Sequence, residues 1–506
     1  MSKQNSRGSH WRLMQGIGLA ALLLCAISAI AFAVILVSAM LLPGKYIAVV
    51  LVSLALVIAL VTVLIWNPGK KGRCITGAVL SVLFSTVFII GAMYINKGVD
   101  TAKEITTPQE ETTNVGIYVR ADDINDFSQV AATYRYGILA QQDRENTDDA
   151  INQINQQYNV TITPQEYDGL PQLIDAILGK DVDAIILNSA YLDLLPEMEG
   201  YETAADQLKE VTITYVKRQV VEAQLDPDAL NRLHGNTTDE DTNNDVDEGE
   251  GEGEVFTVFI SGIDSRSGLV AKSRSDVNIL ASVNTATHKV VLISTPRDYY
   301  VPLSISGGAK DKLTHAGIYG IDVCMDTMAM LYGVDVDYYF RVNFTGFEDI
   351  IDAIGGVTVN SDYAFTAGGY SYVQGENQMD GAKALSFVRE RHSFAEGDRQ
   401  RGKNQLALIR TVIEKAMSPE WLVNYNSVMD SLSDSFETSV PYDLISKTIR
   451  NQLSTGGSWS VSTYSVDGSG DSQVPYSMSQ KAYVMVPDQS TVDTAKQMIQ
   501  DLYDGK

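Results

Sequence analysis

The chain has 506 residues, enough for several domains at roughly 100–200 residues each. Its net charge of −25 argues against a nucleic acid as the main partner, because a phosphate backbone would be repelled. Only three cysteines are present (Cys25, Cys74 and Cys324), so a disulfide framework and a cysteine-based zinc site are both excluded as the basis of the fold.

Three uncharged apolar runs, residues 17–42, 46–66 and 75–95, open the chain. A helix needs about 20 apolar residues to cross a hydrocarbon core of about 30 Å, and each run is long enough. A cleaved signal peptide fits poorly, because its apolar region would be about 7–15 residues and two further runs follow here. We therefore predict that residues 1–96 form a cytoplasmic N-terminus and three transmembrane helices.

Basic residues flank these runs unequally. Clusters precede the first run and separate the second from the third: Lys3, Arg7 and Arg12, then Lys70, Lys71 and Arg73. The turn between the first and second runs holds only Lys45. Because basic flanks stay in the cytoplasm, we predict a multi-pass cell-membrane protein whose large C-terminal part, after Asn96, is extracytoplasmic.

After a linker predicted at residues 97–112, strand and helix patterns alternate through residues 113–230. The expected strands are Val115–Val119, Val160–Ile162 and Asp183–Leu187, and the expected helices are Ala150–Gln156, Gly169–Leu178 and Tyr191–Glu197. This alternation indicates a small α/β accessory domain. It contains no catalytic constellation, which favours a binding or spacing module.

Residues 235–254 are rich in acidic residues and almost free of apolar ones. Such a segment cannot bury enough surface to offset the entropy of ordering, so we predict a flexible linker. A separate domain should follow at residues 255–506.

This last domain opens with three strand patterns, Val255–Ile263, Val277–Val283 and Val290–Ser294. Asp264 and Arg297 stand just beyond the first and third strands. In open α/β sheets ligands bind at the carboxyl ends of the strands, so both side chains are candidates for a binding site.

Two later segments bring further cations. Arg389 and Arg391 are two residues apart, so an extended backbone would point both to one side. Asp398 is placed to cap a helix that runs to about Ala416. The apolar face of that helix comprises Leu406, Ile409, Ile413 and Ala416. Arg401 and Gln405 lie on a different stripe, which would let them return to the site.

The candidate side chains share a chemistry. Carboxylates without histidine or cysteine partners suit a hard ion such as Mg²⁺. Guanidinium groups bind phosphate oxygens bidentately, and five arginines gather here: Arg274, Arg297, Arg389, Arg391 and Arg401. Together they predict a pyrophosphate site, although each residue taken singly would also fit an ordinary surface ion pair.

At these residues the sequence resembles the LytR-CpsA-Psr family of cell-wall glycopolymer ligases, clearly over Val255–Ser418 and more loosely to Lys506. The motifs that carry the resemblance are Asp264-Ser265-Arg266, Arg274-Ser275-Asp276, Ser294-Thr295-Pro296-Arg297-Asp298, Lys312-Leu313-Thr314-His315-Ala316, Asp352-Ala353-Ile354-Gly355-Gly356-Val357, Val388-Arg389-Glu390-Arg391 and Asp398-Arg399-Gln400-Arg401. The anchor and accessory domain resemble the capsule-type branch.

The resemblance implies a three-layer α/β/α sandwich and a phosphotransferase. The substrate would be a polyprenyl-pyrophosphate-linked glycan, such as a capsular or teichoic-acid-like polymer, and the acceptor peptidoglycan. By matching positions, Asp264 and Asp276 would hold Mg²⁺, with Mn²⁺ as a substitute. Arg274, Arg297, Arg389 and Arg391 would grip the phosphates and act in catalysis, with Arg401 and Gln405 completing the pocket. Proteins of a capsule-export complex are possible further partners.

Two other functions would use the same pocket. A non-catalytic receptor would retain lipid-linked glycans and organise capsule assembly. A polyprenyl-pyrophosphate hydrolase, or an enzyme that attaches glycans to proteins, would carry out different chemistry on the same carrier.

Overall fold

The computed structural model describes residues 2–66, 71–106, 110–219, 254–263, 272–416, 436–456 and 458–506. These form two compact units. The helical unit comprises residues 1–106 and 440–458, and the sheet unit comprises residues 107–439 and 459–506. The predicted acidic linker at residues 235–254 lies outside the described residues, apart from its last position.

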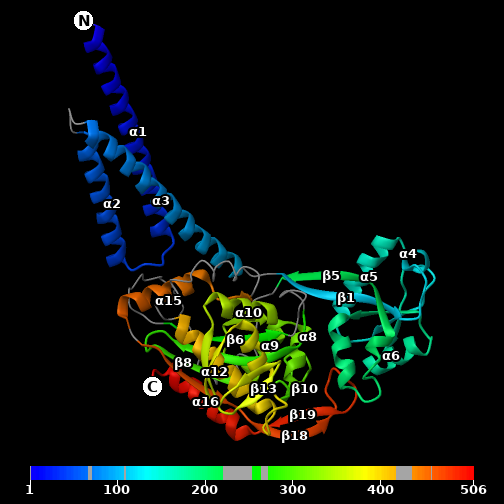
Figure 1. Ribbon diagram of the computed structural model, residues 1–506. Coiled ribbons are helices and arrows are strands. Elements are labelled where there is room, and N and C mark those ends of the chain that lie inside the picture. The colour runs from blue at the N-terminus through cyan, green and yellow to red at the C-terminus, as the bar shows by residue number, and fades with distance from the viewer. Residues whose placement is uncertain are drawn as a thin grey trace, which may run out of the picture. The chain divides into compact units, whose positions relative to one another are not determined.

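The helical unit contains three long helices that pack side by side: α1 (Ser2–Ser38), α2 (Gly44–Ile65) and α3 (Lys71–Ile105) (Figure 1). A shorter helix, α15 (Tyr442–Thr455), belongs to the same unit. By length and composition, Met14–Ser38, Gly44–Ile65 and Lys71–Lys103 can each cross a membrane. The three predicted apolar helices are therefore confirmed.

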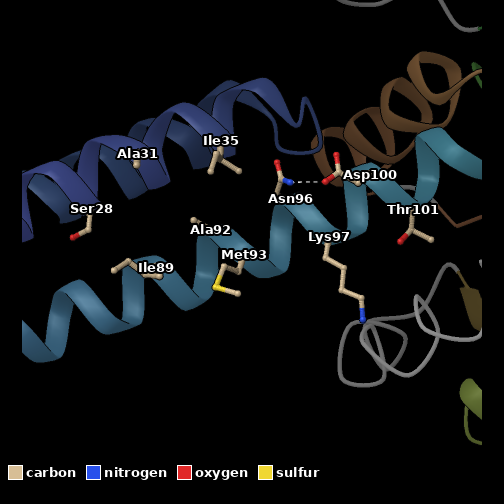
Figure 2. Close-up of a pocket in the computed structure, with 10 residues that line it drawn as sticks. All are labelled: Ser28, Ala31, Ile35, Ile89, Ala92, Met93, Asn96, Lys97, Asp100 and Thr101. Carbon is tan, nitrogen blue, oxygen red and sulfur yellow. Dashed lines mark hydrogen bonds between the residues drawn. The ribbon is translucent and has the colours of Figure 1, made fainter.

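The linker predicted at residues 97–112 is wrong in its extent, because α3 continues to Ile105 and the next strand begins at Glu110. Asn96 donates a side-chain hydrogen bond of 2.5 Å to Asp100 one turn later, and Lys103 lies in the last turn, where a cation suits the helix dipole. Figure 2 shows a groove between α1 and α3 whose lining changes from apolar at Ile89 and Met93 to polar beyond Asn96.

Residues 110–219 form the accessory subdomain of the sheet unit, drawn in cyan to green in Figure 1. Its five-stranded sheet has the order β3-β2-β4-β1-β5. The strands are β1 (Glu110–Arg120), β2 (Tyr136–Leu139), β3 (Gln165–Tyr167), β4 (Ala184–Asn188) and β5 (Leu208–Gln219). The helices are α4 (Phe127–Val130), α5 (Arg144–Tyr158), α6 (Leu170–Leu178), and the 3₁₀ segments η1 (Ser189–Glu197) and η2 (Ala205–Gln207).

The expected strand at Val160–Ile162 is wrong, since the sheet strand β3 lies further along the chain. Asn159 ends α5 in the left-handed conformation, with φ of 52°. The Ile162 backbone N–H then donates to the Asn155 side chain at 2.9 Å. The segment is therefore tied to the end of α5 and not to the sheet.

The rest of the sheet unit is the sandwich subdomain, built on a six-stranded sheet of order β16-β11-β6-β7-β8-β17. The strands are β6 (Val255–Ile263), β7 (Ser275–Asn284), β8 (Lys289–Thr295), β11 (Tyr338–Asn343), β16 (Phe436–Thr438) and β17 (Ser460–Ser465). β7 is antiparallel to both β6 and β8. The start of β7 therefore lies at the same sheet edge as the carboxyl ends of β6 and β8.

Helices cover both faces of this sheet (Figure 1). Leu280 and Ile293 face α9 (Ile321–Tyr332) and α16 (Gln489–Tyr503), whereas Ile279 and Leu292 face Leu406 of α12 (Asp398–Ala416). Alternate strand residues thus enter two cores, as the period of two requires. The predicted three-layer α/β/α sandwich is confirmed.

The predicted apolar face of α12 is also confirmed for its first three residues, since Leu406, Ile409 and Ile413 pack in one core; the Ala416 side chain lies outside the described residues. The remaining elements of the subdomain are β9 (Tyr300–Pro302), β10 (Lys310–Lys312), η3 (Leu313–His315), α8 (Ala316–Tyr319), α10 (Phe344–Ala353), β12 (Val357–Ser361), β13 (Phe365–Ala367), β14 (Tyr370–Tyr372), β15 (Gly375–Met379), α11 (Gly381–Arg389), β18 (Gly468–Gln473) and β19 (Ala482–Pro487).

The two subdomains share a hydrophobic core. Ile318 and Met478 of the sandwich are fully buried in the same cluster as Tyr191 and Leu194 of the accessory subdomain. Burial of this apolar surface fixes the accessory subdomain against the sandwich. Its role as a binding or spacing module stays a prediction.

Candidate active site

Three predicted site residues meet at the sheet edge where β8 ends and β7 begins. Arg274 immediately precedes β7, Asp276 is the second residue of β7, and Arg297 lies two residues beyond β8. The antiparallel register pairs Asn278 with Thr295 and so brings these segments together. The antiparallel register thus brings Arg274, Asp276 and Arg297 to one edge of the sheet.

Arg297 links two carboxylates. Its Nη1 donates to Asp276 Oδ1 at 2.8 Å, and its Nη2 donates to Glu197 Oε1 at 3.1 Å. Thr314 Oγ1 also donates to Asp276 Oδ1, at 3.2 Å. These hydrogen bonds orient the guanidinium fork and the Asp276 carboxylate relative to each other.

Three cationic side chains donate hydrogen bonds to the Glu197 carboxylate. Its Oε1 also accepts from Arg274 Nη1 at 2.7 Å, and its Oε2 accepts from Lys312 Nζ at 2.5 Å. Burial alone would raise the pKa of Glu197, but the charges of Lys312, Arg297 and Arg274 outweigh burial and lower the pKa to about 2. The carboxylate is therefore ionised throughout the physiological pH range.

Two further charged side chains, Asp398 and Arg401, lie in the first turn of α12. Arg401 forms an ion pair with Asp398 one turn earlier in the helix. Burial raises the pKa of Asp398 although Arg401 opposes it, and burial lowers the pKa of Arg401. Gln405 Nε2 donates to the Val388 carbonyl at 3.3 Å, so this residue braces the backbone of α11.

The expectation that Arg389 and Arg391 project to one side of an extended strip is wrong. Arg389 is the last residue of α11, whose first turn is capped by the Asp380 side chain. The Arg389 guanidinium lies over the Phe344 ring, 4.1 Å from its centroid. Arg391 follows the helix end and interacts electrostatically with Asp398 and Arg401. These interactions connect Arg391 to the charge cluster.

Sequence reasoning missed three members of this cluster, namely Lys312, Glu197 and Asp298. Lys312 belongs to a quoted family motif, and that motif was the signal that could have assigned it. Glu197 carries no local signal, because the chain separation from its three partners is 77 to 115 residues. Asp298, 3.5 Å from Lys312 Nζ, completes the inner carboxylates.

The described donor set would fit a magnesium ion only where phosphate oxygens supplied most of its ligands. Asp276 offers one carboxylate at the sheet edge, and Asp264 lies outside the described residues. Within the described ranges no group of three or more His, Cys, Asp or Glu side chains could hold a metal. Mg²⁺ often binds through one or two carboxylates plus phosphate oxygens, so the residues are compatible with it without forming a protein cage.

His315 of the quoted motif belongs to the core. Its Nδ1 lies 2.7 Å from Asp311 Oδ1 and 2.8 Å from Ser477 Oγ, and its side chain is fully buried. A Ser-His-Asp triad uses the two ring nitrogens for two different partners, whereas here one nitrogen meets both. This cluster therefore does not have the geometry of a hydrolase triad.

Comparisons with known proteins point to one family. A model of the LytR_cpsA_psr family matches residues 228–500. The polyisoprenyl-teichoic acid–peptidoglycan teichoic acid transferase TagU of Oceanobacillus iheyensis is 32% identical over 241 residues, which cover 46% of this chain and 73% of the relative. TagU of Bacillus subtilis is 33% identical over 189 residues, which cover 37% of this chain and 61% of that relative.

Solved structures are similar to half of the chain. The crystal structure of B. subtilis TagV has 24% identity and a TM-score of 0.43, covering 50% of this chain and 98% of TagV. The structure of TagT bound to LI-WTA has 25% identity and a TM-score of 0.40, and the match covers 51% of this chain and 94% of TagT. A second family model, described as a DNA polymerase processivity factor, matches residues 70–187. This match is shorter than the first and includes the apolar helix α3, so we assign no function from it.

Proposed function

Because this chain belongs to the LytR-CpsA-Psr family, we propose that it is a membrane-anchored transferase acting at the cell wall. It moves a glycan-1-phosphate from a polyprenyl-pyrophosphate carrier to a hydroxyl of peptidoglycan. The relatives named as teichoic acid–peptidoglycan transferases support the polymer class and the acceptor. Capsular or teichoic-acid-like polymers are both suitable cargo.

One observation carries the proposal most directly: Arg274, Arg297 and Lys312 converge on a single point at the sheet edge. Two guanidinium forks and an ammonium group form a binding place for a phosphate oxygen. Solvent reaches the place, because the Arg274 side chain is 18% exposed. A pyrophosphate is a ligand that matches this concentration of cations.

The reaction follows from this arrangement. The acceptor hydroxyl oxygen forms a bond to the phosphorus that carries the glycan, and its proton passes to a base. The bond from that phosphorus to the bridging oxygen breaks, and polyprenyl phosphate leaves with the electron pair. Arg297 and Arg274 stabilise the negative charge that shifts to the leaving phosphate. A bound Mg²⁺ would add further charge neutralisation beside Asp276.

A single experiment separates this transferase from the alternatives. The purified chain is incubated with a labelled polyprenyl-pyrophosphate glycan and peptidoglycan. We expect label in peptidoglycan and release of polyprenyl phosphate. Label released as free glycan phosphate would indicate a hydrolase, and label retained on intact carrier would indicate a receptor.

The magnesium proposal has its own test. Asp276→Asn keeps the size of the side chain but removes its charge, so we expect it to remove most turnover while the unfolding temperature stays close to that of the wild type. A chelator should reduce wild-type turnover in the same way, and Mg²⁺ or Mn²⁺ should restore it. Full wild-type turnover in chelator would show that the cations of the protein neutralise the pyrophosphate without a metal.

The proposed orientation places the sheet unit outside the cytoplasm, as the basic flanks of the apolar helices indicate. A reporter active only outside the cytoplasm should report when fused after Asn96 and remain silent when fused near Lys70. The opposite pattern would contradict a role in cell-wall assembly, because the site would never meet peptidoglycan.

A further inference from the structure

Glu197 lies within the cation cluster although it belongs to the accessory subdomain. Its carboxylate accepts hydrogen bonds from Arg274, Arg297 and Lys312. These three cations belong to the part of the chain matched by the family model, which begins at residue 228, whereas Glu197 lies before it. The carboxylate is therefore contributed to the site by the accessory subdomain.

The backbone that carries Glu197 is firmly anchored. Leu194 and Leu195 of η1, and Met198 directly after it, are fully buried in the core shared by the subdomains. The Glu197 side chain, by contrast, is 23% exposed. Rotation about its own side-chain bonds is therefore enough to move the carboxylate out of the cluster, and the subdomains need not separate.

The surrounding charges explain why the Glu197 carboxylate lies in the cluster. The cations connected here by contacts or charge interactions are Arg274, Arg297, Lys312, Arg391 and Arg401, and the inner carboxylates other than Glu197 are Asp276, Asp298 and Asp398. Among these described residues, the cations outnumber the carboxylates once Glu197 is left out. Partly buried cations without a counter-charge are costly, so a carboxylate is held there.

A phosphoryl ligand would use the same donors. A diphosphate carries more negative charge than one carboxylate and presents more acceptor oxygens to the two guanidinium forks. Its oxygens and the Glu197 carboxylate cannot occupy the same position between Arg274, Arg297 and Lys312. The ligand must therefore displace the Glu197 carboxylate. Otherwise it binds while Glu197 still occupies some of the hydrogen-bond donors of Arg274, Arg297 and Lys312.

We propose that Glu197 is a displaceable anion that competes with phosphoryl groups for Arg274, Arg297 and Lys312. Through it the accessory subdomain sets the affinity of the site for both the diphosphate substrate and the monophosphate product. By returning to the cluster, Glu197 helps to expel the polyprenyl phosphate that remains after transfer. This inference rests on the proposed function, since it assigns the cluster to phosphoryl ligands.

The test measures binding of farnesyl diphosphate and farnesyl phosphate to the full chain in detergent, by calorimetry at one fixed salt concentration. Glu197→Gln keeps the shape of the side chain and removes its charge. We expect it to tighten binding of both probes by about 10-fold, or about 1.4 kcal/mol. Glu197→Asp keeps the charge on a shorter side chain and should give an intermediate change.

Glu199→Gln is the matched control, because it removes the same charge from an exposed position two residues away. We expect its dissociation constants to equal those of the wild type, and all variants are checked for an unchanged unfolding temperature. Unchanged or weaker binding by Glu197→Gln would overturn the inference and make Glu197 a positioning residue. If the wild type and every variant fail to bind either probe, the proposed function itself fails.

Discussion

Replacement of Arg297 by alanine is expected to reduce glycan transfer by about 10³–10⁵-fold, which corresponds to roughly 4–7 kcal/mol of transition-state stabilisation. Arg297 is the arginine that contacts both Asp276 and Glu197, and its side chain is 11% exposed. Its removal takes away a bidentate donor from the place where charge develops. Arg297→Lys should recover only part of the rate, because an ammonium group lacks the fork.

The measurement is single-turnover transfer from a labelled carrier at saturating peptidoglycan. Arg410→Ala is the matched control: Arg410 lies on α12, is 52% exposed and pairs with Glu414 one turn later, so its loss should leave the rate unchanged. Because Arg391 interacts electrostatically with Asp398 and Arg401, Arg391→Ala should also reduce the rate. A folded Arg297→Ala variant with near-normal transfer would contradict the assigned site.

The largest expected effect on stability is at Arg341. This residue of β11 is almost fully buried, donates to Glu437 Oε1 at 2.7 Å and to Glu111 Oε1 at 2.8 Å, and so joins the accessory strand β1 to the sandwich. Burial would lower the pKa of Arg341, but both carboxylates outweigh it and raise the pKa. Arg341→Met leaves two buried carboxylates without this partner, so we expect a loss of about 3–5 kcal/mol.

The loss is measured as the shift of the urea unfolding midpoint of the full chain. Arg144→Met is the control, since Arg144 is 36% exposed and its ion pairs with Asp148 and Glu166 should contribute less than about 1 kcal/mol. Combining Arg341→Met with Glu111→Leu and Glu437→Leu should restore much of the stability, because a buried charge network can be replaced by apolar side chains. A single Arg341→Met variant as stable as the wild type would contradict this account.

Sequence patterns were sufficient where local interactions decide the outcome. The three apolar runs predicted α1, α2 and α3, because a membrane-spanning length of apolar residues is visible in the sequence itself. The strands β6, β7 and β8 were predicted within two residues at each end, since each is a short segment rich in valine, isoleucine and leucine. The position of Arg297 after β8 followed directly from those boundaries.

Local patterns failed where a cap or a distant partner competed with them. The spacing of Arg389 and Arg391 suited an extended strip, but helix α11 begins after its Asp380 cap and includes Arg389, whose guanidinium lies over the Phe344 ring. The third apolar run ended at Ile95, whereas the Asn96–Asp100 hydrogen bond lets α3 continue.

The assembly of the site was decided by the tertiary structure alone. Glu197 is separated by 100 residues from Arg297 and by 115 from Lys312. It reaches them because its neighbours Tyr191 and Leu194 are buried with Ile318 and Met478 in the core shared by the subdomains. The sequence determined that arginines and carboxylates would gather at the end of a sheet. Which carboxylate they hold depends on burial of apolar surface between segments far apart in the chain, and no local pattern contains that information.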